Sequence, residues 1–238
     1  MPLAVGQNLD LPERVAHHAI NVLRLRRSDA LTLFNGAGGE YRARIVGVGR
    51  ARVSVEVSDW LATERESPLS ITLVQALQAG EKMDLTVQKA VELGVDRIVP
   101  LISIRCVLRL QGERALRRLE HWRGVVVAAC EQCGRNRLPE VLLPERLEHW
   151  LARNAPACGV RLMLAPAAGR SLANVPGPPV GRAVELLIGA EGGLAPEETR
   201  LAGLAGFLPV RLGPRILRTE TAGLAALAAI QFLWGDLK

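Results

Sequence analysis

The residues best suited to chemistry lie near the C-terminus, in the stretch LGPRILRTETAGLAAL over residues 212–227. Arg215, Arg218 and Glu220 stand there between a Gly-Pro turn and a long apolar run. A buried helix needs only its apolar positions, so these charged side chains serve something besides packing. An arginine can stabilise developing negative charge and a carboxylate can accept a proton. The stretch is therefore a candidate catalytic segment.

A second candidate is the glycine-rich loop GAEGGLAPEE over residues 189–198, which follows an apolar run. Its glycines would allow backbone N–H groups to approach a ligand closely. The spacing is not the G-x-G-x-x-G of dinucleotide-binding folds, and the chain has neither the usual phosphate-binding loop G-x-x-x-x-G-K-[ST] nor the G-x-S-x-G of serine hydrolases. Taken alone, the loop is either a ligand site or an ordinary tight connection.

Both stretches belong to a part of the chain in which strand-like and helix-like runs alternate. Strand-like runs cover residues 71–77, 97–103, 160–165, 184–188 and 209–212. Helix-like runs cover residues 82–93, 113–133, 196–205 and 221–234. This alternation predicts an α/β fold with a mainly parallel sheet and helices on both faces. Such sheets bind ligands beyond the carboxyl ends of their strands, where both candidate segments and the loop at Pro166 would lie.

The N-terminal part follows a different pattern. A helix is predicted over residues 10–25, because Asp10 and Glu13 are placed almost as in a capping box. Three antiparallel strands are predicted after it, around the turn signals Asn35-Gly36 and Gly38-Gly39. Alternation along these strands sets apolar residues inward and a strip of arginines outward, at Arg42, Arg44, Arg50 and Arg52.

The arginine strip is either a solvated outer face or a phosphate-binding surface. The polar stretch over residues 61–70 separates the two patterns. It predicts a domain over residues 1–66 and a second over residues 67–238.

Composition sets the class of protein. The chain has 238 residues, of which 49% are hydrophobic and 23% charged. Its longest apolar run, residues 222–234, is shorter than the about 20 residues of a membrane span. Four cysteines and no export signal favour the cytoplasm. Arginine carries almost all of the net charge of +6, which favours a nucleic-acid partner, although a GC-rich genome would raise the arginine content in the same way.

Two motifs raise the question of a metal. Cys130 and Cys133 form a C-x-x-C pair at the end of a predicted helix, and His17 and His18 adjoin on another. Neither motif has further ligands nearby in the sequence, so packing is the favoured interpretation and zinc or redox chemistry the alternative. We expect no metal.

The chain carries, in this order, the blocks EKMDLTVQKAVELGVDRIVPLIS, AACEQCGRNRLPEV, LLIGAEGGLAPEE and LGPRILRTETA. With these blocks it resembles the bacterial 16S ribosomal RNA uracil-N3 methyltransferases of the SPOUT superfamily, from about His17 to the C-terminus. The resemblance implies a small PUA- or OB-like β-barrel that binds RNA, followed by a SPOUT α/β domain. It also implies a C-terminal trefoil knot and a homodimer.

By the same resemblance, S-adenosylmethionine is held by backbone atoms of three loops. The residues implied are Leu164, Gly189, Glu191, Gly192, Gly193, Leu212, Gly213, Ile216, Leu217 and Thr221. Leu212, Ile216 and Leu217 would supply apolar walls for the adenine. In the glycine loop, Ala190 stands where the family usually has proline, and Ala195 holds a helix-cap position.

The implied chemistry is methyl transfer to N3 of uracil. That nitrogen must lose a proton before it becomes a good nucleophile, and it lies on the pairing edge, so the uridine must be unpaired or turned out of its stack. We assign Arg218 to electrostatic stabilisation of the uracil oxygens. Glu220 is either the proton acceptor or the group that orients Arg218, and the alternative for Glu220 is a carboxylate that interacts with the helix dipole.

The implied partner is 16S ribosomal RNA, more plausibly folded in a small ribosomal subunit than naked. The residues assigned to RNA binding are Arg24, Arg26, Arg42, Arg44, Arg135 and Arg137. Arg135 and Arg137 could instead contact a partner subunit or compensate a helix dipole. Two other functions stay open, namely a SPOUT enzyme acting on transfer RNA or a ribose 2′-hydroxyl, and a non-catalytic RNA-binding assembly factor.

Overall fold

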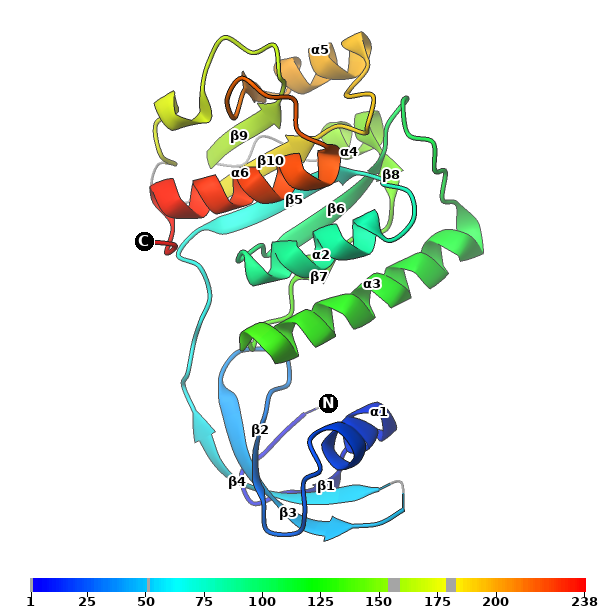
Figure 1. Cartoon of the computed structure of the whole chain (residues 1–238), viewed down its shortest axis with the longest axis vertical. Helices are drawn as coiled ribbons and strands as arrows, with labels where there is room; N and C mark the ends of the chain where they lie inside the picture. The colour runs from blue at the N-terminus through cyan, green and yellow to red at the C-terminus, as the bar shows by residue number, and fades with distance from the viewer. Residues whose placement is uncertain (1, 51, 154–158, 179–182) are drawn as a thin grey trace. The chain divides into compact units, whose positions relative to one another are not determined.

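The structure, a computed structural model, describes residues 2–50, 52–153, 159–178 and 183–238 (Figure 1). It divides into two compact units. The N-terminal unit comprises Met1–Arg65 with Gly134–Leu138, and the C-terminal unit comprises Glu66–Cys133 with Pro139–Lys238. The segment Gly134–Leu138, which the predicted boundary places in the second domain, thus belongs to the first unit.

The N-terminal unit is built on an antiparallel sheet with the strand order β1-β4-β3-β2. Its strands are β1 (Asn8–Asp10), β2 (Ala30–Leu33), β3 (Glu40–Val48) and β4 (Val53–Leu61). The alternation predicts that Tyr41, Ala43, Ile45, Val53 and Val55 face inward. Ala43, Ile45, Val53 and Val55 are buried in the core of this unit, Tyr41 packs against it partly buried, and Val57 also belongs to the core. The four arginines of the predicted strip are exposed. Both observations confirm the alternation of the β3–β4 pair.

The predicted helix over residues 10–25 is wrong at its start. Asp10 is the last residue of β1, where its backbone pairs with Ser54 and its carboxylate accepts a hydrogen bond of 2.6 Å from the Ser54 hydroxyl. The helix α1 (Glu13–His17) begins after Pro12 and continues as one π-helical turn over His18–Val22. The long-range strand pairing outweighs the local capping pattern at Asp10.

The segment 134–138 is tied to the N-terminal unit through backbone and side-chain hydrogen bonds. The Asn136 amide donates to the carbonyl of Thr63 at 2.7 Å, and the Asn136 carbonyl accepts from the N–H of Gly38 at 3.2 Å. The N–H of Leu138 donates to the carbonyl of Gly36 at 3.2 Å. These bonds explain why a segment that follows a helix of the C-terminal unit packs with the N-terminal unit.

The C-terminal unit contains a parallel sheet with the order β11-β9-β10-β5-β6-β7, on which β8 also pairs with β6. The strands are β5 (Ser70–Ala76), β6 (Arg97–Ile102), β7 (Glu140–Val141), β8 (Glu145–Arg146), β9 (Gly159–Leu164), β10 (Ala183–Ile188) and β11 (Leu208–Val210). The five strands predicted from apolar runs are all present. The two-residue strands β7 and β8 are too short to show a periodic pattern, and they were not predicted.

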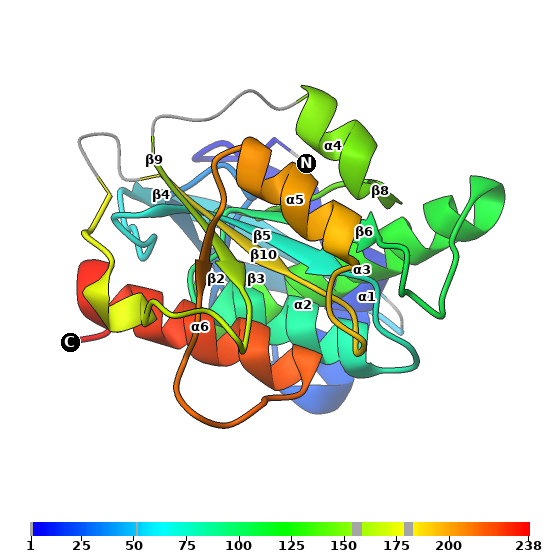
Figure 2. The same cartoon turned by 90° about the horizontal axis from the view of Figure 1, so that it is seen from above.

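Helices cover both faces of this sheet (Figure 1 and Figure 2). On one face lie α2 (Lys82–Glu92), α3 (Gly112–Cys133) and α6 (Thr219–Trp234), and on the other lie α4 (Leu147–Arg153) and α5 (Pro196–Leu204). The core on the α4–α5 side includes Val74, Met163 and Phe207. These observations confirm the predicted α/β fold, whereas the trefoil knot remains a prediction. Within the described part of the chain, no helix is both long and apolar enough to cross a membrane.

Candidate active site

A cavity of about 370 Å³ opens at the carboxyl edge of the sheet in the C-terminal unit. Its walls come from residues 164–166, from the loop that begins at Ile188, from the segment between residues 210 and 222, and from Lys82. The first three follow β9, β10 and β11, which are neighbours in the sheet although the sequence separates them. Small-molecule sites usually measure about 300–1,000 Å³, so a cofactor-sized ligand fits.

Most of the residues assigned to the cofactor line this cavity. They are Leu164, Gly189, Glu191, Gly193, Leu212, Gly213, Ile216 and Leu217. Gly192 does not line it, and its carbonyl instead accepts a hydrogen bond of 2.5 Å from the Arg105 guanidinium. Thr221 is exposed on α6 and also lies outside the lining.

The glycine loop is folded so tightly that two positions require glycine. A Cβ atom on Gly189 would come within 2.8 Å of the backbone of Gly193 and Leu194. Gly193 has a φ of +72°, and its N–H donates to the carbonyl of Ala190 at 2.8 Å. The loop therefore presents main-chain atoms to the cavity, as a ligand bound by backbone groups requires.

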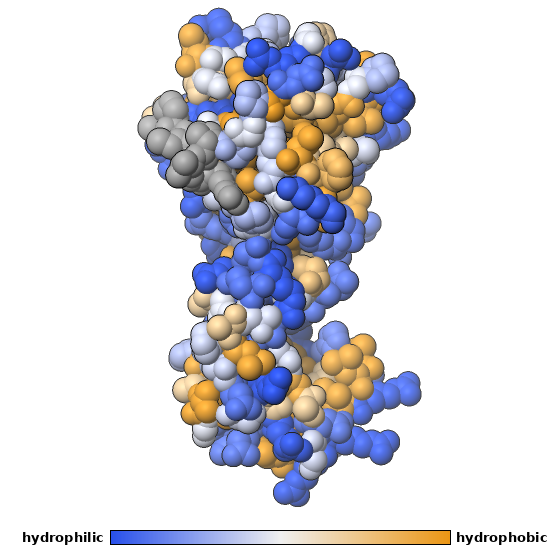
Figure 3. All heavy atoms as spheres, turned by 90° about the vertical axis from the view of Figure 1, so that its left-hand side faces the viewer, coloured by the Kyte–Doolittle hydropathy of each residue, from blue (hydrophilic) through white to orange (hydrophobic). Residues whose placement is uncertain are grey.

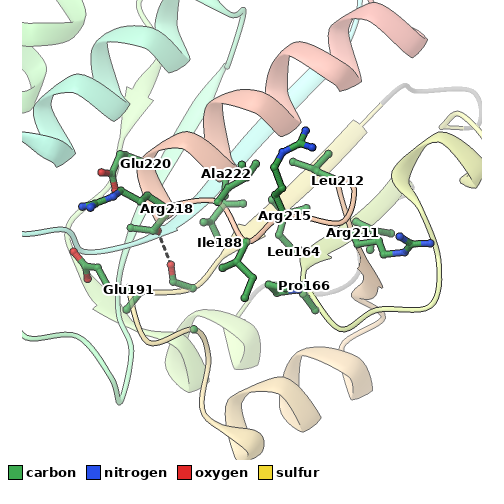
Figure 4. Close-up of a pocket in the computed structure, with 18 of the residues that line it drawn as sticks. Leu164, Pro166, Ile188, Glu191, Arg211, Leu212, Arg215, Arg218, Glu220 and Ala222 are labelled. Carbon is green, nitrogen blue, oxygen red and sulfur yellow. Dashed lines mark hydrogen bonds between the residues drawn. The ribbon is translucent and has the colours of Figure 1, made fainter.

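Apolar side chains and two arginines form one end of the cavity. Figure 4 shows Leu164, Pro166 and Leu212 toward this end together with Arg211 and Arg215, and Ile188 lies between them and the group of Glu191, Arg218 and Glu220. Ile216 also lines the cavity, although 83% of it is exposed. An exposed isoleucine at the edge of a cavity gains free energy when a flat apolar group covers it.

The other end of the cavity is charged. Figure 4 shows Glu191, Arg218 and Glu220 grouped there. The ammonium of Lys82 lies 3.6 Å from Glu191 Oε1 and 3.7 Å from Glu220 Oε1. Glu220 Oε2 is buried and has no hydrogen-bond partner among the described residues. This end therefore combines two cations with a buried carboxylate oxygen that has no hydrogen-bond partner among the described residues.

A buried polar network, which was not predicted, holds the two ends together. The Thr219 hydroxyl donates to the carbonyl of Gly189 at 2.7 Å and accepts from the Gln75 amide at 3.1 Å. With its amide oriented to satisfy its neighbours, Gln78 accepts from the N–H of Glu220 at 3.1 Å and donates to the Thr86 hydroxyl at 2.8 Å. The first turn of α6 is thereby fixed to the glycine loop.

The network and Lys82 could have been suspected from the sequence. Gln75 and Gln78 are the polar interruptions in the apolar run that ends β5, and both are fully buried. Buried amides need partners, so their position at a carboxyl strand end is a signal of a functional edge. Lys82 is one of only three lysines in a chain whose positive charge is otherwise arginine.

The residues assigned to RNA binding lie in the N-terminal unit. Arg24, Arg26, Arg42, Arg44 and Arg137 are exposed. Arg137 pairs with a carboxylate of the same unit, and acidic residues stand opposite Arg42 and Arg44 on β4. Arg135 is only 4% exposed, so its side chain is not available to a phosphate.

The residues considered for metal binding do not assemble into a site. Cys130 is buried and Cys133 half-buried at the end of α3, and they lie in a helix that packs on α2. Across the described residues, no group of three or more histidine, cysteine, aspartate or glutamate side chains is placed to hold a metal ion.

Comparison with known proteins follows the division of the chain. Residues 65–231 match the family model of an RNA methyltransferase domain, and residues 11–58 match that of an RNA methyltransferase PUA domain. The PUA match agrees with the prediction of a small RNA-binding β-domain. The two matches together identify the chain as an RNA methyltransferase with a PUA domain.

Relatives of known name match the chain over at least nine-tenths of its length. The chain is 35% identical to the ribosomal RNA small subunit methyltransferase E of Buchnera aphidicola subsp. Schizaphis graminum, over 99% of this chain and 94% of that protein. It is 31% identical to the enzyme of the same name from Bacillus subtilis, over 91% and 86%.

Two solved structures resemble the whole chain. The ribosomal RNA small subunit methyltransferase E of Neisseria gonorrhoeae, bound to S-adenosylmethionine, superposes with a TM-score of 0.92 at 42% identity and covers 100% of this chain and 97% of that one. A Legionella pneumophila methyltransferase in complex with the same cofactor gives a TM-score of 0.93 at 41% identity, over 100% and 96%. This chain, with its RNA methyltransferase and PUA domains, therefore belongs to the ribosomal RNA small subunit methyltransferase E family.

Proposed function

We propose that the chain transfers the methyl group of S-adenosylmethionine to N3 of a uridine in the 16S ribosomal RNA of the small subunit. One observation carries the proposal: a single cavity joins an apolar end with backbone-rich walls to a charged end that contains an unpartnered carboxylate oxygen. The first end suits the cofactor and the second suits a base that must lose a proton.

The cavity residues fit S-adenosylmethionine. Leu212, Ile216 and Leu217 would enclose the adenine. The main chain would approach the cofactor at Gly189, where a Cβ atom has no room, and at Gly193, whose positive φ favours glycine. When bound, the cofactor supplies an electrophilic methyl group on a sulfonium. The protein then has to position the uracil and remove one proton.

Glu220 is the proton acceptor in this proposal. Its Oε2 atom has no competing donor among the described residues, and its side chain is 15% exposed, so little water reaches it. Glu220 takes the N3 proton, which leaves an electron pair on N3 for the new bond to carbon. The alternative, that Glu220 serves only to orient Arg218, predicts a smaller loss when its charge is removed.

Arg218 and Lys82 stabilise the charge that deprotonation creates. Loss of the N3 proton spreads negative charge over the two carbonyl oxygens of the ring. Arg218 is exposed at the start of α6, where it forms no ion pair with a described residue, and it can turn toward one oxygen. Lys82, whose ammonium lies 3.7 Å from Glu220 Oε1, would stabilise the second.

The proposal includes two partners, namely the ribosomal RNA and a second copy of this chain in a homodimer. Arg24, Arg26, Arg42, Arg44 and Arg137 would bind phosphates of the folded subunit. A homodimer is proposed because α6 leaves apolar residues exposed at its end, with Phe232 64% and Leu233 37% exposed. Figure 3 shows hydrophobic side chains exposed among hydrophilic ones on one face of the C-terminal unit. An enzyme of assembled subunits would work in the cytoplasm.

The test is methyl transfer from labelled S-adenosylmethionine to small ribosomal subunits that lack their native modifications, with naked rRNA in parallel. We expect 3-methyluridine at one site of the 16S rRNA, identified by mass spectrometry of the nucleosides. A different methylated nucleoside would contradict the N3 assignment and favour a SPOUT enzyme that methylates another atom or another RNA. Cofactor binding without any transfer to either substrate would contradict the catalytic proposal.

A further inference from the structure

One cluster of arginines in the C-terminal unit is used neither by the cavity nor by the N-terminal RNA-binding residues. Residues 103–118, which lead from β6 into the first turns of α3, contain five arginines and a single acidic residue, Glu113. This short segment carries a charge of +4, out of a net +6 for the whole chain. Such a concentration of fixed positive charge attracts a polyanion.

The segment is hydrogen-bonded at both of its ends to loops that also supply residues to the cavity lining. The Arg105 guanidinium donates to the carbonyl of Gly192 at 2.5 Å, which attaches the loop after β6 to the glycine loop. Glu198 Oε1 reinforces this attachment by accepting from the N–H of Ile104 at 2.8 Å. At the other end, the Arg118 guanidinium, in the first turns of α3, donates to the carbonyl of Gly80 at 3.2 Å, two residues before Lys82 in the sequence.

The side chains are available for a ligand. Arg109 and Arg114 are exposed and form no ion pair with a described residue. Arg117 lies 3.9 Å from Glu113, and both side chains are so exposed, 74% and 87%, that the pair is weak. Arg118 is half-buried against α2 and is left out. The remaining residues form what we call the basic rim, Arg105, Arg109, Arg114 and Arg117.

We propose that the basic rim binds phosphates of the RNA strand next to the nucleotide that enters the cavity. The inference rests on the proposed function in so far as the substrate is RNA. A uridine turned out of its stack has to be held by its backbone on either side, because unstacking costs free energy that phosphate contacts can offset. Arginine suits this role, since its planar guanidinium bonds phosphate oxygens in pairs.

The experiment measures the equilibrium affinity of the full-length protein for deproteinised small-subunit rRNA as a function of salt. The variants are Arg109→Ala, Arg114→Ala and the two combined. Arg97→Ala is the matched control, because Arg97 is also exposed but stands at the amino end of β6, away from the cavity. Each phosphate that an arginine no longer neutralises lowers the slope of log affinity against log salt by about 0.7 for single-stranded RNA.

We expect the double variant to show a slope smaller by about 1.4, so that its affinity deficit is about sevenfold larger at about 50 mM than at about 200 mM salt. A slope equal to that of the wild type, or an equal drop in Arg97→Ala, overturns the proposal. Normal binding to rRNA combined with weaker binding to intact subunits would also overturn it, since the rim would then recognise a ribosomal protein. The methylated product is identified separately, so a wrong substrate atom would not be mistaken for a failure of the rim.

Discussion

Removing the hydroxyl of Thr219 should weaken cofactor binding, because this hydroxyl bonds the glycine loop to α6. Thr219→Val keeps the shape of the side chain but deprives the carbonyl of Gly189 of its donor at 2.7 Å. The Gln75 amide loses one acceptor and keeps the carbonyl of Ala76 at 3.1 Å. One buried acceptor is thus orphaned, which costs about 1–3 kcal/mol. Because the Gly189 carbonyl borders the cavity and water can reach it, we expect about 1–2 kcal/mol.

The assay is calorimetric titration with S-adenosylmethionine together with urea denaturation. A loss of about 1–2 kcal/mol corresponds to an affinity about 5- to 30-fold lower if the glycine loop shifts. Thr219→Ser keeps the hydroxyl and should restore binding. Thr199→Val makes the same change at an exposed position of α5 and should stay within about 0.5 kcal/mol of the wild type. Wild-type affinity and stability in Thr219→Val would refute the role given to the network.

Three further changes separate chemistry from packing. Glu220→Gln should lower kcat by about 10²- to 10⁴-fold, as expected for loss of a general base, with little change in the Kd of the cofactor; full single-turnover rates would exclude Glu220 as the proton acceptor. Lys82→Met should lower kcat by up to about fivefold, because the Lys82 side chain is 36% exposed and water weakens its attraction to the uracil oxygens to about 1 kcal/mol or less. Lys82→Arg should recover part of the rate. Ala195→Ser should raise the free energy of unfolding by about 1 kcal/mol in a thermal melt, since Ala195 lacks a side-chain acceptor for the start of α5 and only the Glu198 half of a capping box is present. An unchanged melting temperature would mean that the buried N-cap has no room for the hydroxyl.

The parallel sheet and the position of its site could be predicted from local patterns. Strands buried on both faces are continuous apolar runs, and the helices between them show their own period, so each element is visible in its own residues. The glycine loop was recognised for the same reason. A tight turn at Gly189 requires glycine at that position, so the requirement is visible in the residues of the turn. In a parallel sheet, the loops that follow the strands lie at the same carboxyl edge even when they are distant in the sequence.

Other features depend on partners that the local sequence does not reveal. Asp10 fits a helix cap, but its backbone pairs with Ser54, 44 residues away. The burial of Arg135 could not be read from its neighbours either, because the segment that contains it packs with the other unit. Lys82 and Gln75 belong to the site only because α2 and β5 face the first turn of α6.

The first turn of α6 couples the two halves of the proposed reaction. It supplies Arg218 and Glu220 to the charged end, while Thr219, between them, bonds the carbonyl of Gly189. Any shift of this turn that moves the Glu220 carboxylate therefore also strains the loop that would hold the cofactor. Changes that displace the first turn of α6, such as Thr219→Val, should consequently alter cofactor affinity and turnover together, whereas Glu220→Gln, which leaves the backbone in place, should alter turnover alone. Changes at the basic rim should alter RNA affinity and its salt dependence while cofactor affinity stays constant, because Arg109 and Arg114 lie outside the lining of the cavity.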